Sequence, residues 1–447
     1  MSDMLTPLTA ISPIDGRYFE EVSVLSEYFS EYALIRYRVQ VEVLYFLALA
    51  DAGIFDLPET ARPALLALFE QFAEADAREV KHIEQTTRHD VKAVEYFVKQ
   101  RLDGLGLSAY REWVHFALTS QDINNTAIPL LWKKALEEQY WPACQQLIDA
   151  LERKAGLWTD IPMLARTHGQ PASPTRLGKE IRVFIERLRG QMRLLQAIPF
   201  TAKFGGATGN FNAHHVAFPD INWEAFADRF VGDTLGLTRI RYTTQIEPYD
   251  HLAAQCDALR RINNILIDFC RDMWLYIAFD YFHQQVNAGE VGSSAMPHKV
   301  NPIDFENAEG NLGWANAGWD HLANKLPISR LQRDLTDSTV LRNLGVPFAH
   351  TLLAFSSIQK GWARLQLHTE KIQDDLQQNW VVVAEAIQTL LRKAGYPEPY
   401  EQLKALTRGQ KLDQQAIHQF IDQLQIPASL KHQMKQITPW NYTGIVQ

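Results

Sequence analysis

Residues 249–288 read YDHLAAQCDALRRINNILIDFCRDMWLYIAFDYFHQQVNA and contain neither glycine nor proline. Apolar residues recur along this stretch at steps of three and four, a spacing that places them on one face of an α-helix. The recurring positions are Leu252, Cys256, Leu259, Ile262, Leu266, Phe269, Met273 and Ile277. A helix of this length would span roughly 60 Å, too far for its apolar seam to be buried against one compact domain. The stretch therefore predicts a long helix in a bundle, and self-association of the chain.

Three further segments show helical spacing, namely 177–195, 348–360 and 378–393. Alternating apolar and polar runs bounded by hairpin signals, which would indicate strands, are scarce. The chain has 447 residues, and at roughly 150 residues per domain it is too long for a single core. We therefore predict an all-α fold with three helical domains, at 1–117, 118–363 and 364–447, the middle one a bundle of long helices.

Composition and charge exclude several classes of protein. The net charge is −8 and lysine and arginine form no run, which argues against sequence-independent binding to nucleic acid. The start of the chain lacks the features of a secretory signal, and no apolar run reaches the roughly 18 residues of a membrane helix. Cys144, Cys256 and Cys270 are far apart and without metal-ligand spacing, so we expect buried thiols in a cytoplasmic protein and no metal site.

The segment 292–302 reads Gly-Ser-Ser-Ala-Met-Pro-His-Lys-Val-Asn-Pro and follows the long helical stretch. It combines a possible proton acceptor, Ser293, with Lys299, Asn301 and backbone N–H groups that could stabilise a developing oxyanion. From composition alone, a plain Ser/Gly-rich connector is the favoured explanation. The glycine-rich residues 205–210 do not indicate a nucleotide-binding loop, since neither Gly-Lys-Ser/Thr nor a βαβ pattern accompanies them, and a tight turn is expected instead.

The complete string Gly-Ser-Ser-x-Met-Pro-x-Lys-x-Asn-Pro resembles the signature of the fumarase/aspartase superfamily, whose members eliminate fumarate or a related acid. The His298-Lys299 pair is similar to the version found in the adenylosuccinate lyase family. The resemblance extends over nearly the whole chain, in segments 12–18, 87–95, 119–125, 166–171, 333–338 and 438–442.

The family resemblance implies a β-elimination that releases fumarate from adenylosuccinate, giving AMP, or from SAICAR, giving AICAR, without a cofactor. It implies that Ser293 is the general base, with Ser294 as the competitor for that role, and that Lys299 helps to stabilise charge. His168 is implied as the general acid, because imidazole titrates near neutral pH. Glu306 resembles the carboxylate that pairs with this histidine and would keep it protonated.

The implied substrate carries a phosphate and carboxylates, so its pocket requires cations and hydroxyl or amide donors. His89 is assigned to substrate binding, while a role in proton transfer and a purely structural role stay open. Ser120 lies where a helix should begin, with Asp122 in its first turn, and such a helix start suits a carboxylate. The complete set of implied binding residues is Arg17, Tyr18, Arg88, His89, Asp90, Thr119, Ser120, Gln245, Asn301, Arg333, Ser338 and Arg342.

The resemblance also implies a homotetramer in which loops from different subunits meet at shared active sites. Two alternatives remain at this point. One is another lyase of the superfamily, such as an argininosuccinate lyase or a cycloisomerase. The other is a helical scaffold without chemistry, against which the presence of Ser293, Lys299, Asn301, His168 and Glu306 speaks.

Overall fold

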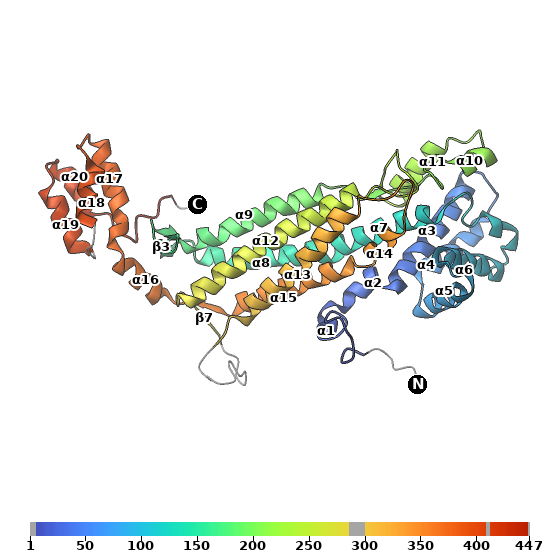
Figure 1. Cartoon of the computed structure of the whole chain (residues 1–447), viewed down its shortest axis with the longest axis horizontal. Helices are drawn as coiled ribbons and strands as arrows, with labels where there is room; N and C mark the ends of the chain where they lie inside the picture. Colours follow the sequence, from blue (N-terminus) through green and yellow to red (C-terminus); the bar gives the residue numbers. More distant parts are fainter. Residues whose placement is uncertain (1–5, 286–299, 408–411, 446–447) are drawn as a thin grey trace. The chain divides into compact units, whose positions relative to one another are not determined.

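The computed structural model describes residues 6–285, 300–407 and 412–445, and most of these residues are helical (Figure 1). They form two compact units, each assembled from three separate stretches of chain. The first unit comprises Met1–Cys144, Gln191–Asn264 and Gly310–Phe355. The second comprises Gln145–Gly190, Ile265–Glu309 and Ser356–Gln447. The three-domain division at 117 and 363 stays a prediction.

The N-terminal part of the first unit is a cluster of four helices, α3 (Glu31–Asp51), α4 (Arg62–Glu70), α5 (Glu74–Thr87) and α6 (Asp90–Gly104) (Figure 1). Ser30 begins α3 by accepting the backbone N–H of Ala33 on its hydroxyl oxygen, at 3.1 Å, which satisfies a helix-end donor. Val39, Phe46 and Phe97 belong to the buried core between these helices. Shorter helices flank them: α1 (Phe19–Val22), η1 (Ser23–Leu25), α2 (Ser26–Phe29), η2 (Glu59–Ala61) and η3 (Ser108–Trp113).

Long helices make up the rest of the first unit. Trp132, on α7 (Ser120–Ala135), packs its ring against Trp319 of α13 (Ile303–Lys325) at 5.9 Å and against Phe348 of α15 (Gly345–Arg364) at 5.8 Å. Its indole N–H donates to Gln255 on α12 (Asp250–Ala278). The remaining elements are η4 (Leu136–Tyr140), β5 (Thr201–Ala202), α10 (Asn212–Ala217), α11 (Trp223–Arg229), η5 (Phe230–Thr234), β6 (Thr238–Arg239) and α14 (Thr336–Leu341). Strands β5 and β6 pair in parallel.

In the second unit, Phe269 of α12 is the centre of another helix bundle. Its ring lies 5.4 Å from Phe184 on α9 (Leu177–Gln196), 5.5 Å from Trp362 on α15 and 6.3 Å from Phe305 on α13. Trp362 also donates its indole N–H to the carbonyl of Ala150 on α8 (Trp141–Leu157). Five helices, α8, α9, α12, α13 and α15, are thus joined through Phe269 and Trp362.

The C-terminal helices of the second unit lie together (Figure 1). They have a core of their own, around Trp380, Ile387, Leu391 and Ile421. They are α16 (Thr369–Gln378), η6 (Trp380–Val383), α17 (Ala384–Lys393), α18 (Pro399–Thr407), α19 (Gln414–Gln423) and α20 (Ala428–Lys435). Three antiparallel pairs of short strands complete the unit: β1 (Pro162–Met163) with β4 (Thr175–Arg176), β2 (Arg166–Thr167) with β3 (Gln170–Pro171), and β7 (Phe282–Gln284) with β8 (Leu365–Leu367).

The predicted all-α class is confirmed, and so are the helices expected at 177–195 and 348–360. The helix expected over 249–288 was predicted too long, because α12 ends at Ala278. Asp280 then has a left-handed φ of 66°, and Phe282–Gln284 pairs with a strand far along the chain. The helix expected over 378–393 is also interrupted, since α17 begins only at Ala384.

Cys144, Cys256 and Cys270 are buried and free, as expected, and burial raises the pKa of the Cys144 thiol to about 12. Within the described ranges, every helix is too short or too polar to cross a membrane.

The contact between the start of α9 and the end of α8 predicts a specific sensitivity. Gly178 donates its N–H to the carbonyl of Trp158 at 3.0 Å. A Cβ atom at Gly178 would collide with the carbonyl oxygen of Ala155 and lie 2.9 Å from Cα of Thr159. Because both obstacles are backbone, Gly178→Ala should destabilise the fold by about 1–3 kcal/mol, measured as a lower thermal unfolding midpoint.

The matched control is Gly156→Ala on α8, where a Cβ atom meets nothing within 4 Å. This substitution should leave the midpoint unchanged or raise it, since alanine is more favourable than glycine in a helix by about 1 kcal/mol. Equal midpoints for the two variants would contradict the predicted collision.

Candidate active site

The N-terminus of α7 is anchored by the buried carboxylate of Asp122. One carboxylate oxygen accepts the backbone N–H of Thr119 at 2.8 Å. The other accepts the Lys203 ammonium at 2.7 Å and the backbone N–H groups of Gly205 and Gly206 at 2.9 and 3.1 Å. Burial lowers the pKa of Lys203, against the opposing effect of Asp122. The expected helix start at Ser120 is confirmed, and the glycine-rich segment is a turn fastened to it.

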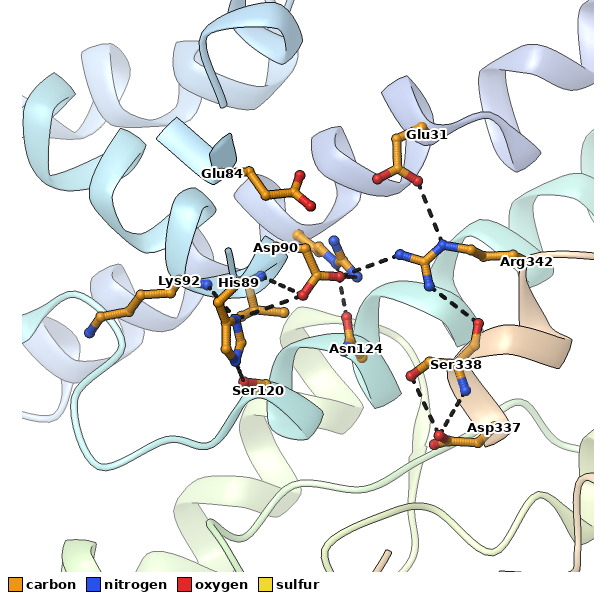
Figure 2. A network of polar contacts seen from close by, with 12 residues as sticks. Glu31, Glu84, His89, Asp90, Lys92, Ser120, Asn124, Asp337, Ser338 and Arg342 are labelled. Atoms are coloured by element: carbon orange, nitrogen blue, oxygen red, sulfur yellow. Dashed lines mark hydrogen bonds and ion pairs between the residues drawn. The ribbon is translucent and has the colours of Figure 1, made fainter. Parts of the chain in front are cut away.

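His89 lies between α5 and α6 and faces the start of α7 (Figure 2). Its Nδ1 accepts the backbone N–H of Lys92 at 3.2 Å, so His89 caps α6. In the neutral ring the proton is then on Nε2, which lies 3.4 Å from Oγ of Ser120. Arg88, just before it, ends α5 in the left-handed conformation, with φ of 52°. The backbone therefore places an imidazole N–H and a hydroxyl side by side at two helix starts.

Asp90 joins two arginines from distant parts of the chain (Figure 2). Its Oδ2 accepts a hydrogen bond from buried Arg38 at 2.8 Å and another from Arg342 at 3.4 Å. Arg38 also donates to Asn124 at 2.8 Å, and Arg342 lies 3.8 Å from Glu31. Although burial opposes it, the Arg38 guanidinium lowers the pKa of Asp90. Asp90 is thus an ionised carboxylate that orients Arg342.

Arg333 is held between α7 and α14. Its Nη2 donates to Oγ of Ser338 at 2.9 Å, and its Nε lies 3.6 Å from Asp337. With its amide oxygen turned toward the guanidinium, Gln121 accepts a hydrogen bond from Arg333 Nε at 3.0 Å. These contacts bring together the segments 119–122 and 333–342, which are far apart in the sequence.

A buried chain of hydrogen bonds supports Asp337 from behind. Tyr249 donates its hydroxyl proton to Asp337 at 3.0 Å and accepts the Asn125 amide at 2.7 Å. The Glu247 carboxylate accepts the Thr201 hydroxyl at 2.9 Å and the backbone N–H of Tyr249. Burial raises the pKa of Glu247 to about 7. The position of Arg333 therefore depends on a layer of side chains beneath the predicted site residues.

The other predicted residues of the first unit lie around this network. Gln245 donates its amide to the carbonyl of Ala207, on the glycine-rich turn, at 3.2 Å. Arg17 lies over the ring of Tyr18 at 6.0 Å, just before α1. Their neighbours Asp15 and Phe19 line a hollow of about 260 Å³ that Arg342 also lines.

His168 lies in the second unit, at the tip of the hairpin of β2 and β3. His168 and Gly169 form its two-residue turn with φ of 53° and 72°, the pattern of a type I′ turn. The hairpin is fastened below its tip, where Arg166 donates to Asp375 at 2.9 Å and stacks over Phe279 at 5.0 Å. The His168 ring is exposed, and among the described residues it has no hydrogen-bond partner. The turn thus presents the imidazole outward.

Glu306 is exposed in the first turn of α13 and accepts the indole N–H of Trp274 at 3.0 Å. Asn301 and then Pro302 precede that helix. The predicted pairing of Glu306 with His168 is not among the contacts of the described residues. Ser293, its competitor Ser294, and Lys299 fall within 286–299, outside the described residues.

Sequence reasoning missed Arg38, Gln121 and Tyr249 as parts of the site. Gln121 lies inside the segment 119–125, which resembles the family. Its side-chain amide, a hydrogen-bonding group, could have marked it as a site residue. Arg38 is 2% exposed on a helix that is otherwise rich in apolar residues, and a buried cation requires partners. Its partner Asn124 is 86 positions away, so spacing alone could not reveal the pair.

The first unit therefore concentrates groups that suit an anionic, hydrogen-bonding ligand. Arg38, Asn124, Ser338 and Arg342 line a hollow of about 240 Å³. A guanidinium has five N–H donors, more than these internal contacts use, and it matches carboxylate and phosphate geometry. Ser120 and His89 add a hydroxyl and an imidazole beside it.

The buried carboxyl of Glu247 predicts a pH-dependent stability. Its pKa rises from 4.5 to about 7 on folding, so the folded state prefers the protonated form. This contribution is fully present below about pH 4.5 and is lost as pH rises through about 7, a change of about 3 kcal/mol. Glu247→Gln, which stays neutral, should lose less stability than the wild type between pH 5 and pH 8 in chemical denaturation.

The control is Glu70→Gln, at the exposed end of α4, which should follow the wild-type profile. Parallel pH profiles for Glu247→Gln and the wild type would refute a protonated buried carboxyl.

Comparisons with known proteins identify the family of the chain. A family model described as lyase matches residues 16–315, and one described as adenylosuccinate lyase C-terminal matches residues 329–443. The chain is 56% identical to an adenylosuccinate lyase of Dictyostelium discoideum over 99% of this chain and 98% of the relative. It is 50% identical to an adenylosuccinate lyase of Escherichia coli strain K12, over 98% of this chain and 97% of the relative.

Solved structures support the same fold. A 3-carboxy-cis,cis-muconate lactonizing enzyme from Pseudomonas putida matches with a TM-score of 0.74 at 20% identity, over 96% of each chain. A fumarate lyase from Mesorhizobium sp. BNC1 matches with a TM-score of 0.74 at 18% identity, over 94% of this chain and 95% of that one. These two structural matches show the fold alone. The family is shown by the identities of 56% and 50%, over nearly the full length, to the two adenylosuccinate lyase sequences. The chain belongs to the adenylosuccinate lyase family.

Proposed function

We propose that the chain removes fumarate from adenylosuccinate, giving AMP, and from SAICAR, giving AICAR. The observation that carries this proposal is the 56% identity, over nearly the whole length, to a relative named adenylosuccinate lyase. The arginine-rich network of the first unit supports it, because both substrates carry a phosphate and carboxylates, for which guanidinium groups are suited.

The reaction is a β-elimination in which a C–N bond breaks, and it requires two proton transfers. Ser293 takes the proton from the carbon next to a carboxylate. A serine hydroxyl is a weak base, so the developing charges require Lys299, Asn301 and backbone N–H groups around them. These roles rest on the family resemblance, and Ser294 is the competing base.

His168 protonates the departing nitrogen. Its support is the outward-facing turn, which is held by the Arg166 to Asp375 ion pair and leaves the imidazole accessible. Glu306 pairs with His168 and favours its protonated form. In the folded chain Glu306 is exposed at a helix start, where a carboxylate is favoured by the helix dipole.

The anionic groups of the substrate bind to the residues gathered around α7 and α14. Arg333 and Arg342 are oriented by Asp337 and Asp90, so that little ordering remains to be done when a ligand arrives. Hydrogen bonds to the substrate come from the side chains of Thr119, Ser120, Gln245 and Ser338. Arg88 and His89, together with Arg17 and Tyr18, contact the phosphate.

The enzyme acts as a homotetramer in the cytoplasm, and its active sites combine loops from different subunits. The support for shared sites is that His168 is exposed on its hairpin and has no partner within the described part of the chain. A complete site then requires groups from a second copy of the chain, and an isolated monomer is inactive.

A spectrophotometric assay for loss of the succinylated purine tests the function. Purified wild-type protein should release AMP and fumarate from adenylosuccinate in equal amounts. Ser293→Ala should lose roughly 10²–10⁴-fold in kcat, the usual contribution of a positioned base, and should still bind substrate. The adjacent Ser294→Ala is the matched control and should keep most of its turnover. Absence of product with the wild type would exclude the function. A larger loss of kcat in Ser294→Ala than in Ser293→Ala would make Ser294 the general base.

Mixing two inactive variants tests the shared site. His168→Ala and Ser293→Ala tetramers should regain part of the wild-type activity after subunit exchange, because some sites then combine one intact histidine with one intact serine. Exchange is verified by native mass spectrometry of differently labelled subunits. A mixture that has exchanged and remains inactive would show that both residues come from one subunit.

A further inference from the structure

Two histidines and an aspartate converge where α12 ends and β7 pairs with β8. Figure 1 shows β7 close to one end of α12. Asp280 lies in the turn after α12, His283 is the central residue of β7, and His368 follows β8 directly. Nε2 of His283 lies 2.9 Å from Nδ1 of His368 and 2.9 Å from Oδ1 of Asp280. Nδ1 of His368 lies 3.3 Å from Oδ2 of Asp280. Nδ1 of His368 also lies 3.0 Å from the backbone carbonyl oxygen of Asp280. Three possible ligand atoms therefore lie close together in one small volume.

The spacing of these atoms matches a tetrahedral metal site. With metal–nitrogen and metal–oxygen bonds of about 2.0–2.1 Å, neighbouring ligand atoms lie about 3.3 Å apart. The two imidazole nitrogens are 2.9 Å apart, and each has one Asp280 carboxylate oxygen within 2.9 to 3.3 Å. With one ligand atom from each residue, all three atoms lie within 4.8 Å of one another, so small side-chain rotations bring them to that spacing. The exposed side chains can make such shifts, since His283 and Asp280 are 52% and 59% exposed.

The backbone holds the three residues in place without a metal. His283 is paired with Gln366 across the two strands, and the N–H of His368 donates to the carbonyl of Tyr281 at 2.8 Å. Asp280 takes its position through a left-handed φ of 66°, which aspartate tolerates better than most residues. The cluster is therefore preformed, as an effective binding site requires.

We propose that Asp280, His283 and His368 bind a divalent transition metal such as Zn²⁺, with water completing the coordination. Two imidazoles and one carboxylate suit zinc and its neighbours, whereas Mg²⁺ and Ca²⁺ prefer oxygen ligands alone. The metal joins the turn after α12 to both strands of a short pair. Strands of three residues are weak on their own, so the metal stabilises the pairing of β7 with β8. The site is independent of the proposed elimination chemistry.

Metal binding to the intact protein, prepared without a polyhistidine tag and stripped with a chelator, tests this site. Titration with Zn²⁺ against a chromophoric chelator should find one site per chain, and Co²⁺ should give the intense visible absorption of a tetrahedral complex. His283→Gln and His368→Gln, which keep a polar side chain, should each weaken binding at least tenfold. Zn²⁺ should raise the thermal midpoint of the wild type and not that of these variants.

The matched control is His82→Gln, an exposed histidine on α5 far from the cluster in sequence, which should bind as the wild type does. Circular dichroism of the metal-free variants verifies folding. If a variant fails to fold, the wild-type Co²⁺ spectrum decides alone. Failure of the wild type to bind a stoichiometric metal, or binding by the folded His283 and His368 variants as tight as that of the wild type, would overturn the proposal and leave a cluster of hydrogen bonds only.

Discussion

The ion pair of Asp122 and Lys203, both side chains fully buried, is the constraint on which the first unit depends. A buried carboxylate must be compensated, and removing one partner of such a pair costs roughly 3–5 kcal/mol. Asp122 meets this requirement with four hydrogen bonds that come from the start of α7 and from the glycine-rich turn. Ser120 and Gln121 are carried by the same helix start, so their positions follow from the satisfaction of one buried charge.

Around this anchor, carboxylates position arginines. Asp90 lies between Arg38 and Arg342, and Asp337 holds Arg333 with help from the Tyr249 hydroxyl. Each guanidinium keeps further N–H donors for a ligand, while its side-chain entropy is already restricted. Such preorganisation lowers the entropic cost of placing an anionic substrate. An acidic chain can thus gather arginines in one place, because local partners and not the net charge of −8 set the electrostatics of this network.

The second unit places its predicted catalytic residue differently. His168 lies at an exposed turn and has a positive φ, a backbone conformation that is unfavourable for most residues other than glycine. Arg88 and Tyr249 also have positive φ, Arg88 in the turn before α6 and Tyr249 directly before α12. Strain of this kind persists only where the surrounding contacts over-determine the backbone, as the Arg166 to Asp375 pair does below the hairpin tip.

The sequence alone determined the helical class, the start of α7, the burial of the cysteines and the family, because periodicity, capping residues and contiguous motifs are local properties. Tertiary structure alone decided where α12 ends, since Phe282–Gln284 leaves the helix to pair with Leu365–Leu367. It also decided that Arg38 meets Asn124 and that His283 meets His368, at separations of 86 and 85 residues. Contacts between residues so far apart depend on how the chain folds back on itself, and no spacing along the sequence encodes them.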